Sequence, residues 1–232
     1  MRRESSTVIA LVGRVSLGLM TALAESGNVA VARAAEPSGT AGSGRSIRPA
    51  VRARPAGIDA SAAAAEPPVR AGWEQGALAM RAAARHRATY VVVANDPLAG
   101  VASAWREMWS VAAGPGAAAA FEEQAAETLA AWRSKQFELP DYYLVVVAAQ
   151  HLTIGADLYL GPLRAARPRR ITVAAVVDTA PDPDGLAVTA SLLDTLRSLE
   201  HGPWWPPLDE LLEAARRFHA GGLAETQRAR YS

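Results

Sequence analysis

Two aspartates follow apolar segments at positions where acidic side chains can do chemistry. Asp96 comes directly after the apolar run at residues 89–94, and Asp178 follows a second run at residues 171–177. Because the carboxyl ends of parallel strands form the ligand-binding edge of an α/β sheet, two carboxylates there can hold Mg²⁺ or serve a hydrolase. The competing interpretation is structural, since aspartate is common in turns and at helix starts. Pro97, directly after Asp96, favours this capping role.

One histidine lies in a segment with a chemical pattern. His151-Leu152-Thr153 is similar to half of the pattern of the two-histidine phosphoesterases, in which paired imidazoles act as general acid and base. The other half would be a second His-x-Thr or His-x-Ser, and the three remaining histidines are followed by residues that do not supply it. The sequence therefore favours an ordinary strand-end or loop role for His151. An enzyme would need Asp96, Asp178 and His151 to converge.

An arginine cluster and a tryptophan pair are the main candidates for binding a partner. The arginines lie in a proline-containing turn and are Arg164, Arg167, Arg169 and Arg170. Guanidinium groups bind phosphates or acidic partners, although a solvated turn is the competing interpretation. Trp204 and Trp205 are framed by prolines between two helical segments. Neighbouring side chains of an extended segment point apart, so one ring can seal the core and the other can anchor an interface.

The sequence lacks most recognised catalytic patterns. It has no cysteine, which excludes disulfides, thiolate metal ligands and a cysteine nucleophile. We find no glycine-rich phosphate loop, no Gly-x-Ser-x-Gly elbow and no His-Glu-x-x-His motif. With four scattered histidines, no metal and no other cofactor is expected. These absences favour a non-enzymatic protein.

Charge separates the N-terminal third from the rest of the chain. Residues 1–72 hold nine arginines against five acidic residues, which leaves 15 basic and 18 acidic residues in the remainder. A mildly acidic folded part argues against a nucleic-acid binder, because neutralising phosphates needs a basic face. The apolar runs are also too short to span a bilayer.

The N-terminal third is expected to lie outside the folded domain. Residues 1–34 have the outline of a secretory leader, with Arg2 and Arg3 before an apolar stretch, but Arg14 interrupts that stretch, so a frayed or amphipathic helix is the main expectation. Residues 35–72 are rich in Ala, Pro, Gly, Ser and Arg without periodicity and are predicted to be a disordered linker. A single domain is then expected at residues 73–232. Translation from Met1 or from near Met80 is left open.

The domain is predicted to alternate strands and helices. Apolar runs predict strands at 89–94, 142–149, 157–160 and 171–177, and helical spacing predicts helices near 73–87, 101–112, 121–132, 186–199 and 207–218. About four strands with helices indicate an α/β (α+β) fold, a two-layer sandwich of elaborated ferredoxin-like kind, with a three-layer α/β/α fold as the alternative. Apolar runs do not distinguish parallel from antiparallel pairing, so strand order is left open.

Two segments carry a resemblance to a known group of proteins. They are Asp157–Leu163 with its arginine turn, and His201–Pro206 before a leucine-rich helix. In these segments the chain is similar to accessory proteins of actinobacterial conflict systems associated with caspase-like peptidases and TPR repeats. The resemblance covers about residues 140–220 and carries no catalytic residue. It implies a non-enzymatic adaptor or effector encoded beside a peptidase or NTPase module.

Together these observations predict a cytoplasmic, non-enzymatic interaction module. It would present Trp204, Trp205 and the arginine turn to a protein partner. The alternative is a small hydrolase or nucleotide-binding enzyme that uses carboxylates at strand ends. A secreted protein is expected instead if residues 1–34 are a cleaved leader.

Overall fold

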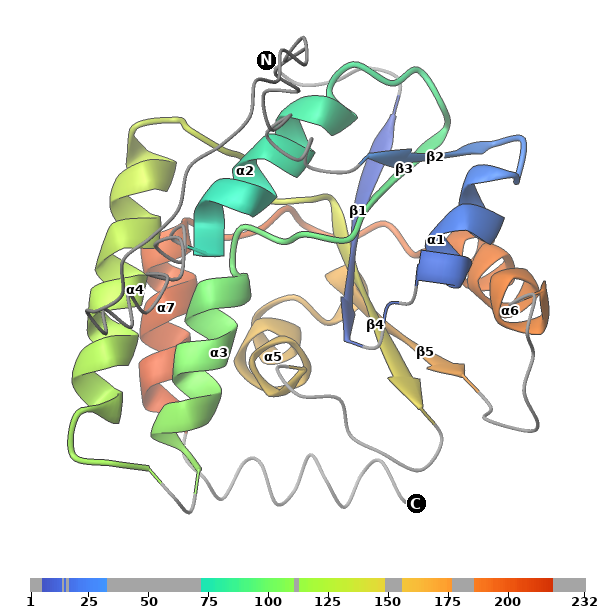
Figure 1. Cartoon of the computed structure of the whole chain (residues 1–232). Coiled ribbons are helices and arrows are strands. Elements are labelled where there is room, and N and C mark those ends of the chain that lie inside the picture. The colour runs from blue at the N-terminus through green and yellow to red at the C-terminus, as the bar shows by residue number, and fades with distance from the viewer. Residues whose placement is uncertain are drawn as a thin grey trace, which may run out of the picture.

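A parallel sheet with helices on both faces forms the centre of the protein (Figure 1). The computed structural model describes residues 6–13, 15, 17–32, 72–110, 113–148, 156–176 and 186–218. The five strands of the sheet are β1 (Thr7–Gly13), β2 (Val29–Ala32), β3 (Tyr90–Val93), β4 (Tyr142–Ala148) and β5 (Ile171–Val176). Their order across the sheet is β2-β3-β1-β4-β5, so β1 is the middle strand.

The strands are almost entirely apolar because both faces of the sheet are covered. In β1 every residue from Val8 to Val12 is buried. Val8 and Val12 belong to the core on one face, whereas Ile9 and Leu11 belong to the core on the other. Continuous Val, Ile and Leu runs of this kind are typical of parallel strands between two helical layers.

The helices divide unequally between the two faces, as Figure 1 shows. On one face lie α1 (Leu17–Ala24) and α6 (Leu186–Arg197), which pack through residues such as Leu23 and Leu192. The other face carries α2 (Gly72–Ala83), α3 (Ala99–Met108), α4 (Ala117–Arg133), α7 (Leu208–Arg217) and the helical turns η1 (Tyr159–Leu163), α5 (Arg164–Ala166) and η2 (Pro168–Arg170). The chain moves out to β2 over one face and returns over the other, as crossovers of one constant hand require.

This architecture agrees with the predicted α/β class but differs from the finer expectation. The sheet has five strands and three layers are present, in place of a two-layer sandwich of four strands. The strand predicted at residues 157–160 is wrong, because these residues begin the helical segment that runs through η1 and α5. A short apolar run fits a buried helix as well as a strand, and here the helical turns cover the sheet instead of joining it.

The N-terminal expectation is also corrected. Residues 1–34 were expected to form a frayed helix or leader, yet Thr7–Gly13 is the middle strand and Val29–Ala32 is an edge strand. The fold therefore includes residues before 73, and the boundary predicted there is wrong. The predicted linker at 35–72 lies outside the described residues apart from Gly72, the first residue of α2. Within the described ranges, no helix combines the length and apolarity needed to cross a bilayer.

Candidate functional site

Two hollows lie at opposite ends of the strands. The first, called here the carboxyl-edge pocket, has a volume of about 480 Å³ and is lined by residues at or just after the ends of β1 and β3, including Gly13, Val15, Asn95 and Asp96. β1 and β3 are neighbours in the sheet, but the chain leaves β1 toward α1 on one face and leaves β3 toward α3 on the other. A crevice opens at such a switch point, which is where open α/β sheets bind ligands.

Asp96 is the acidic residue among those that line this pocket, at the sheet edge where its position after β3 predicted it. Asp96 is 3% exposed, and its carboxylate accepts a hydrogen bond from the Tyr143 hydroxyl at 2.9 Å and another from the Tyr159 hydroxyl. Burial raises the pKa of Asp96 to about 6, and the two tyrosine hydrogen bonds oppose that rise. The backbone N–H of Leu98 also donates to this carboxylate, which is the turn role considered for Asp96, whereas the N-cap residue of α3 is Leu98.

The two tyrosines come from separate elements and lock the carboxylate in place. Tyr143 lies on β4 and Tyr159 begins η1, with ring centroids 5.0 Å apart. Burial, reinforced by the Asp96 charge, raises the pKa of both tyrosines well above the usual value of 10. Both hydroxyls therefore keep their protons at neutral pH and act as hydrogen-bond donors to Asp96. A carboxylate held in this way is oriented by the protein interior more than by a ligand.

The turn between β1 and α1 carries a glycine spacing that the sequence reasoning missed. Gly13 and Gly18 are separated by four residues between a strand and a helix, which is the layout of a phosphate-binding P-loop. Gly13 has φ of 105°, a backbone conformation that favours glycine. In that motif the second glycine precedes Lys and then Ser or Thr. Leu19 and Met20 stand at those positions and are buried in the core between the sheet and α6.

Leu19 and Met20 leave this turn without the two P-loop side chains that bind phosphate and Mg²⁺. A P-loop lysine contacts the β- and γ-phosphates and the hydroxyl residue binds Mg²⁺, roles that buried Leu19 and Met20 cannot perform. Among the described residues, no three His, Asp or Glu side chains gather in a way that would hold a metal ion. Asp178 and His151 lie outside the described residues. Their convergence with Asp96 stays a prediction.

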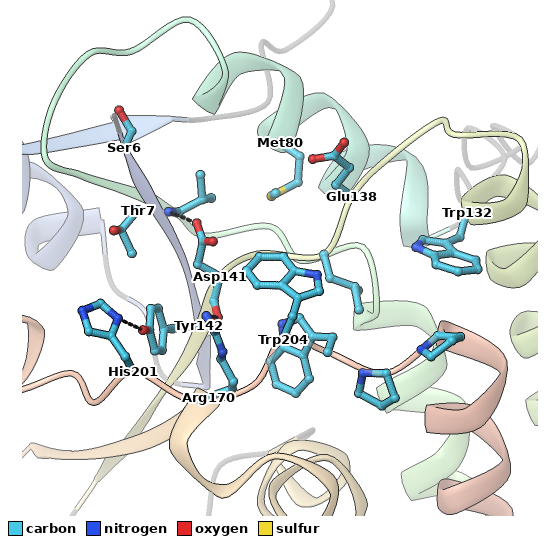
Figure 2. A pocket seen from close by; sticks show the side chains of 15 residues that line it. Ser6, Thr7, Met80, Trp132, Glu138, Asp141, Tyr142, Arg170, His201 and Trp204 are labelled. Atoms are coloured by element: carbon cyan, nitrogen blue, oxygen red, sulfur yellow. Dashed lines mark hydrogen bonds between the residues drawn. The ribbon is translucent and has the colours of Figure 1, made fainter. Parts of the chain in front are cut away.

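The second hollow lies at the amino ends of β1, β4 and β5 and contains several of the predicted partner-binding residues. We call it the tryptophan groove; its volume is about 700 Å³. Figure 2 shows it with Trp204 near its centre, His201 and Tyr142 toward one end and Trp132 at the other. The residues that line it are Ser6, Thr7, Val8, Met80, Trp132, Glu138, Leu139, Asp141, Tyr142, Arg170, His201, Trp204, Trp205, Pro206 and Pro207.

Arg170 fixes one side of this groove. Its guanidinium donates to the carbonyl oxygens of Gly202 at 2.7 Å, Asp141 at 3.1 Å and Pro203 at 3.3 Å. The same group lies 4.8 Å from the ring centroids of both Tyr142 and Trp204. The N–H groups of the guanidinium bind backbone carbonyls while its flat faces pack on the two rings. Arg170 therefore holds the backbone of residues 202–204 and the Trp204 ring against the start of β4.

Of the other three arginines in the cluster, two donate hydrogen bonds to backbone carbonyls and one is exposed to solvent. Arg167 Nε donates to the carbonyl of Trp204 at 2.5 Å, and Arg169 Nη1 donates to that of His201 at 3.4 Å. Arg164 is exposed on α5. The cluster was expected to be a partner-binding or solvated turn. Three of its four guanidinium groups hold the segment that carries the tryptophans, and partner binding by the cluster stays a prediction.

The two tryptophans point in opposite senses, which confirms the expectation from their adjacency. Trp205 is 6% exposed, its Nε1 donates to the carbonyl of Pro140 at 2.8 Å, and its ring meets Tyr143 edge-on with centroids 5.5 Å apart. Trp204 is 44% exposed. Trp205 therefore anchors the segment in the core, and Trp204 presents an indole to whatever enters the groove.

The wall of the groove is carried by helices that are tied to one another. Trp132 belongs to α4, and Pro206 and Pro207 lead directly into α7. Arg216 of α7 forms a two-pronged contact with Glu122 of α4, Nε to Oε1 at 2.9 Å and Nη2 to Oε2 at 2.7 Å. This pairing lowers the pKa of the Glu122 carboxyl and joins the two helices that flank one end of the groove.

Comparison of the chain with known protein families, with curated proteins and with solved structures finds no match.

Proposed function

We propose that this chain is a non-enzymatic module that binds a partner protein at the tryptophan groove. The observation that carries the proposal is the exposed Trp204 indole on a segment whose backbone is held by three arginines. Large aromatic side chains supply much of the binding energy at protein interfaces, and a ring that is already fixed loses little entropy when it binds. A large, rigid and exposed indole beside a hollow is therefore suited to anchor a partner.

The carboxyl-edge pocket supports the non-enzymatic part of the proposal. Phosphoryl transfer depends on positioned cations around the phosphates, and Leu19 and Met20 replace the two P-loop groups that supply them. Asp96, the buried carboxylate of that pocket, is held by two protonated tyrosines. Purified chain incubated with ATP or GTP and Mg²⁺ is expected to release phosphate no faster than a protein-free control.

The resemblance to conflict-system accessory proteins suggests where a partner would be found. We propose a cytoplasmic protein encoded beside this chain, such as a peptidase or an NTPase module. A partner of that class would supply the catalytic activity, and this chain would supply recognition.

Site-specific photo-crosslinking tests the proposal in native cells. In one sample a photoreactive phenylalanine analogue replaces Trp204. In the control sample the same analogue replaces Arg197, which is exposed on α6 in the opposite layer. The expected result is one crosslinked protein from position 204 that is missing from position 197. That protein, once purified, should bind the Trp204→Ala variant at least about tenfold more weakly than the unmodified chain. Equal binding by both chains would overturn the proposal.

Nucleotide binding without hydrolysis is the second candidate function. It is favoured by the glycine-bounded turn after β1 and by the switch-point position of the carboxyl-edge pocket. Titration calorimetry with ADP and GDP would separate the two functions, because saturable nucleotide binding is required by this candidate and not by partner binding.

A further inference from the structure

We propose that the outer edge of β5 pairs with the same edge of a second copy of this chain. The two β5 strands run antiparallel in this dimer and join the sheets of both copies into one. The contact uses backbone groups and Val173 of β5, and Trp204 takes no part in it. The inference therefore does not rest on the proposed function.

β5 is an edge strand whose outer hydrogen-bonding groups are unused. β4 pairs with it on one side only, in a register that runs from Tyr143↔Ile171 to Ala148↔Val176. In the part of the chain that the structure describes, the residues of β5 form no backbone hydrogen bond outside this pairing. The outer edge therefore presents a row of free N–H and C=O groups, which is a template for another strand.

This edge lacks the features that usually prevent edge strands from pairing. Proteins protect such edges with very short strands, charged residues, prolines or bulges. β5 has six residues, none of which is charged or proline, and its regular register with β4 contains no bulge. The edge strand at the other side of the sheet, β2, has only four residues. Pairing is therefore favoured at β5 over β2.

An apolar side chain is exposed beside the unused backbone groups. Val173 is 37% exposed in the middle of β5, whereas its neighbours Ile171 and Ala174 are buried in the cores on the two faces of the sheet. A strand added at this edge would give Val173 a cross-strand neighbour and remove apolar surface from water.

A second copy of β5 has the chemistry that this edge requires. Its Ile, Thr and Val residues suit cross-strand packing, and no like charges meet because the strand is uncharged. A two-fold axis perpendicular to the sheet relates two such strands as an antiparallel pair, so one interface satisfies both edges. This direction also places the exposed Arg169, which precedes β5, at opposite ends of the paired strands. Parallel strands would bring the two basic starts together.

Sedimentation equilibrium of the full chain over a concentration series tests the inference. We expect a species with twice the chain mass of 24.3 kDa. Val173→Lys places a charge on the exposed edge and should be monomeric at concentrations where the unmodified chain is dimeric. Val173→Thr keeps an uncharged, β-branched side chain and should remain dimeric. Ala126→Lys, which adds the same charge at an exposed position of α4, should also remain dimeric.

Crosslinking locates the contact without the lysine variant. The chain has no cysteine, so Val173→Cys introduces a single thiol at the edge of the sheet. A short bis-maleimide should join two Val173→Cys chains and should not join two Ala126→Cys chains. Thermal unfolding curves that match the unmodified chain would show that each variant is folded.

The possible results separate this inference from the proposed function. A monomer at every concentration, a dimer that folded Val173→Lys leaves intact, or a missing Val173→Cys crosslink would each overturn the inference. A dimer that Trp204→Ala dissociates and Val173→Lys does not would place the second copy at the tryptophan groove, which also overturns it. An edge dimer without a crosslinked partner at position 204 would support the inference while the proposed function fails.

Discussion

At the scale of single residues, Asp96 and Arg170 show how the same protein treats two buried charges. Arg170 is surrounded by carbonyl oxygens and rings that favour its charge. Asp96 receives only neutral donors, so burial dominates and its pKa rises to about 6. The carboxylate is therefore a cost to the folded state at neutral pH, whereas the guanidinium is compensated.

Asp96 makes stability depend on pH with a defined sign. Its folded pKa of about 6 is above its ordinary value of 3.8, so the folded state holds the proton more tightly. The resulting stabilisation is fully present below about pH 3.8 and is lost as pH rises through about 6; roughly two pKa units correspond to about 3 kcal/mol. Asp96→Asn does not titrate. Its free energy of unfolding relative to the unmodified chain should therefore rise by about that amount between pH 4 and 8.

Urea unfolding at a series of pH values measures this difference. Asp194→Asn is the control, because Asp194 is exposed on α6 and should show no such trend. A difference between Asp96→Asn and the unmodified chain that stays constant with pH would contradict the prediction.

At the scale of elements, the close approach of α2 to the turn after β3 positions Asp96. A Cβ built on Gly76 of α2 would lie 2.1 Å from the backbone nitrogen of Pro97. Backbone atoms at that distance cannot give way as a flexible side chain would. A glycine inside a helix is normally unfavourable, and here it allows the helix to touch the turn that carries the carboxylate.

Gly76→Ala should therefore destabilise the protein despite the higher helix propensity of alanine. Overpacking of this kind costs about 1–3 kcal/mol, more than the roughly 1 kcal/mol that alanine gains in a helix. Denaturant unfolding measures the cost. Gly114→Ala is the matched control, because nothing lies within 4 Å of a Cβ at that position. Equal stability of the two variants would show that α2 does not depend on this contact.

At the scale of the whole molecule, the middle strand comes from the start of the chain. β1 pairs with β3 through Thr7↔Tyr90 and with β4 through Ile9↔Tyr142, so both halves of the sheet depend on it. A chain of residues 72–232 should therefore not form the native sheet, because β3 and β4 would lose their shared neighbour. Circular dichroism and amide exchange compare it with the full chain. Protected β3 and β4 amides in the shorter chain would contradict the prediction.

The sequence by itself determined the elements with strong local patterns. Apolar runs predicted β3, β4 and β5, and helical spacing predicted α3, α4, α6 and α7. The opposite directions of Trp204 and Trp205 also followed from their adjacency. These features are local, because side-chain alternation and helical periodicity are set by the nearest residues along the chain.

Only the tertiary structure decided the role of segments whose local signals were ambiguous. The apolar run of β1 resembled a leader, and its place became defined only through pairing with residues more than eighty positions away. The helical segment from Asp157 to Ala166 became distinct from a strand by covering the sheet. The contacts of Arg170 with the carbonyl oxygens of Asp141 and Gly202 also join segments about thirty residues apart in the chain. Each decision depends on long-range partners, which local periodicity does not encode.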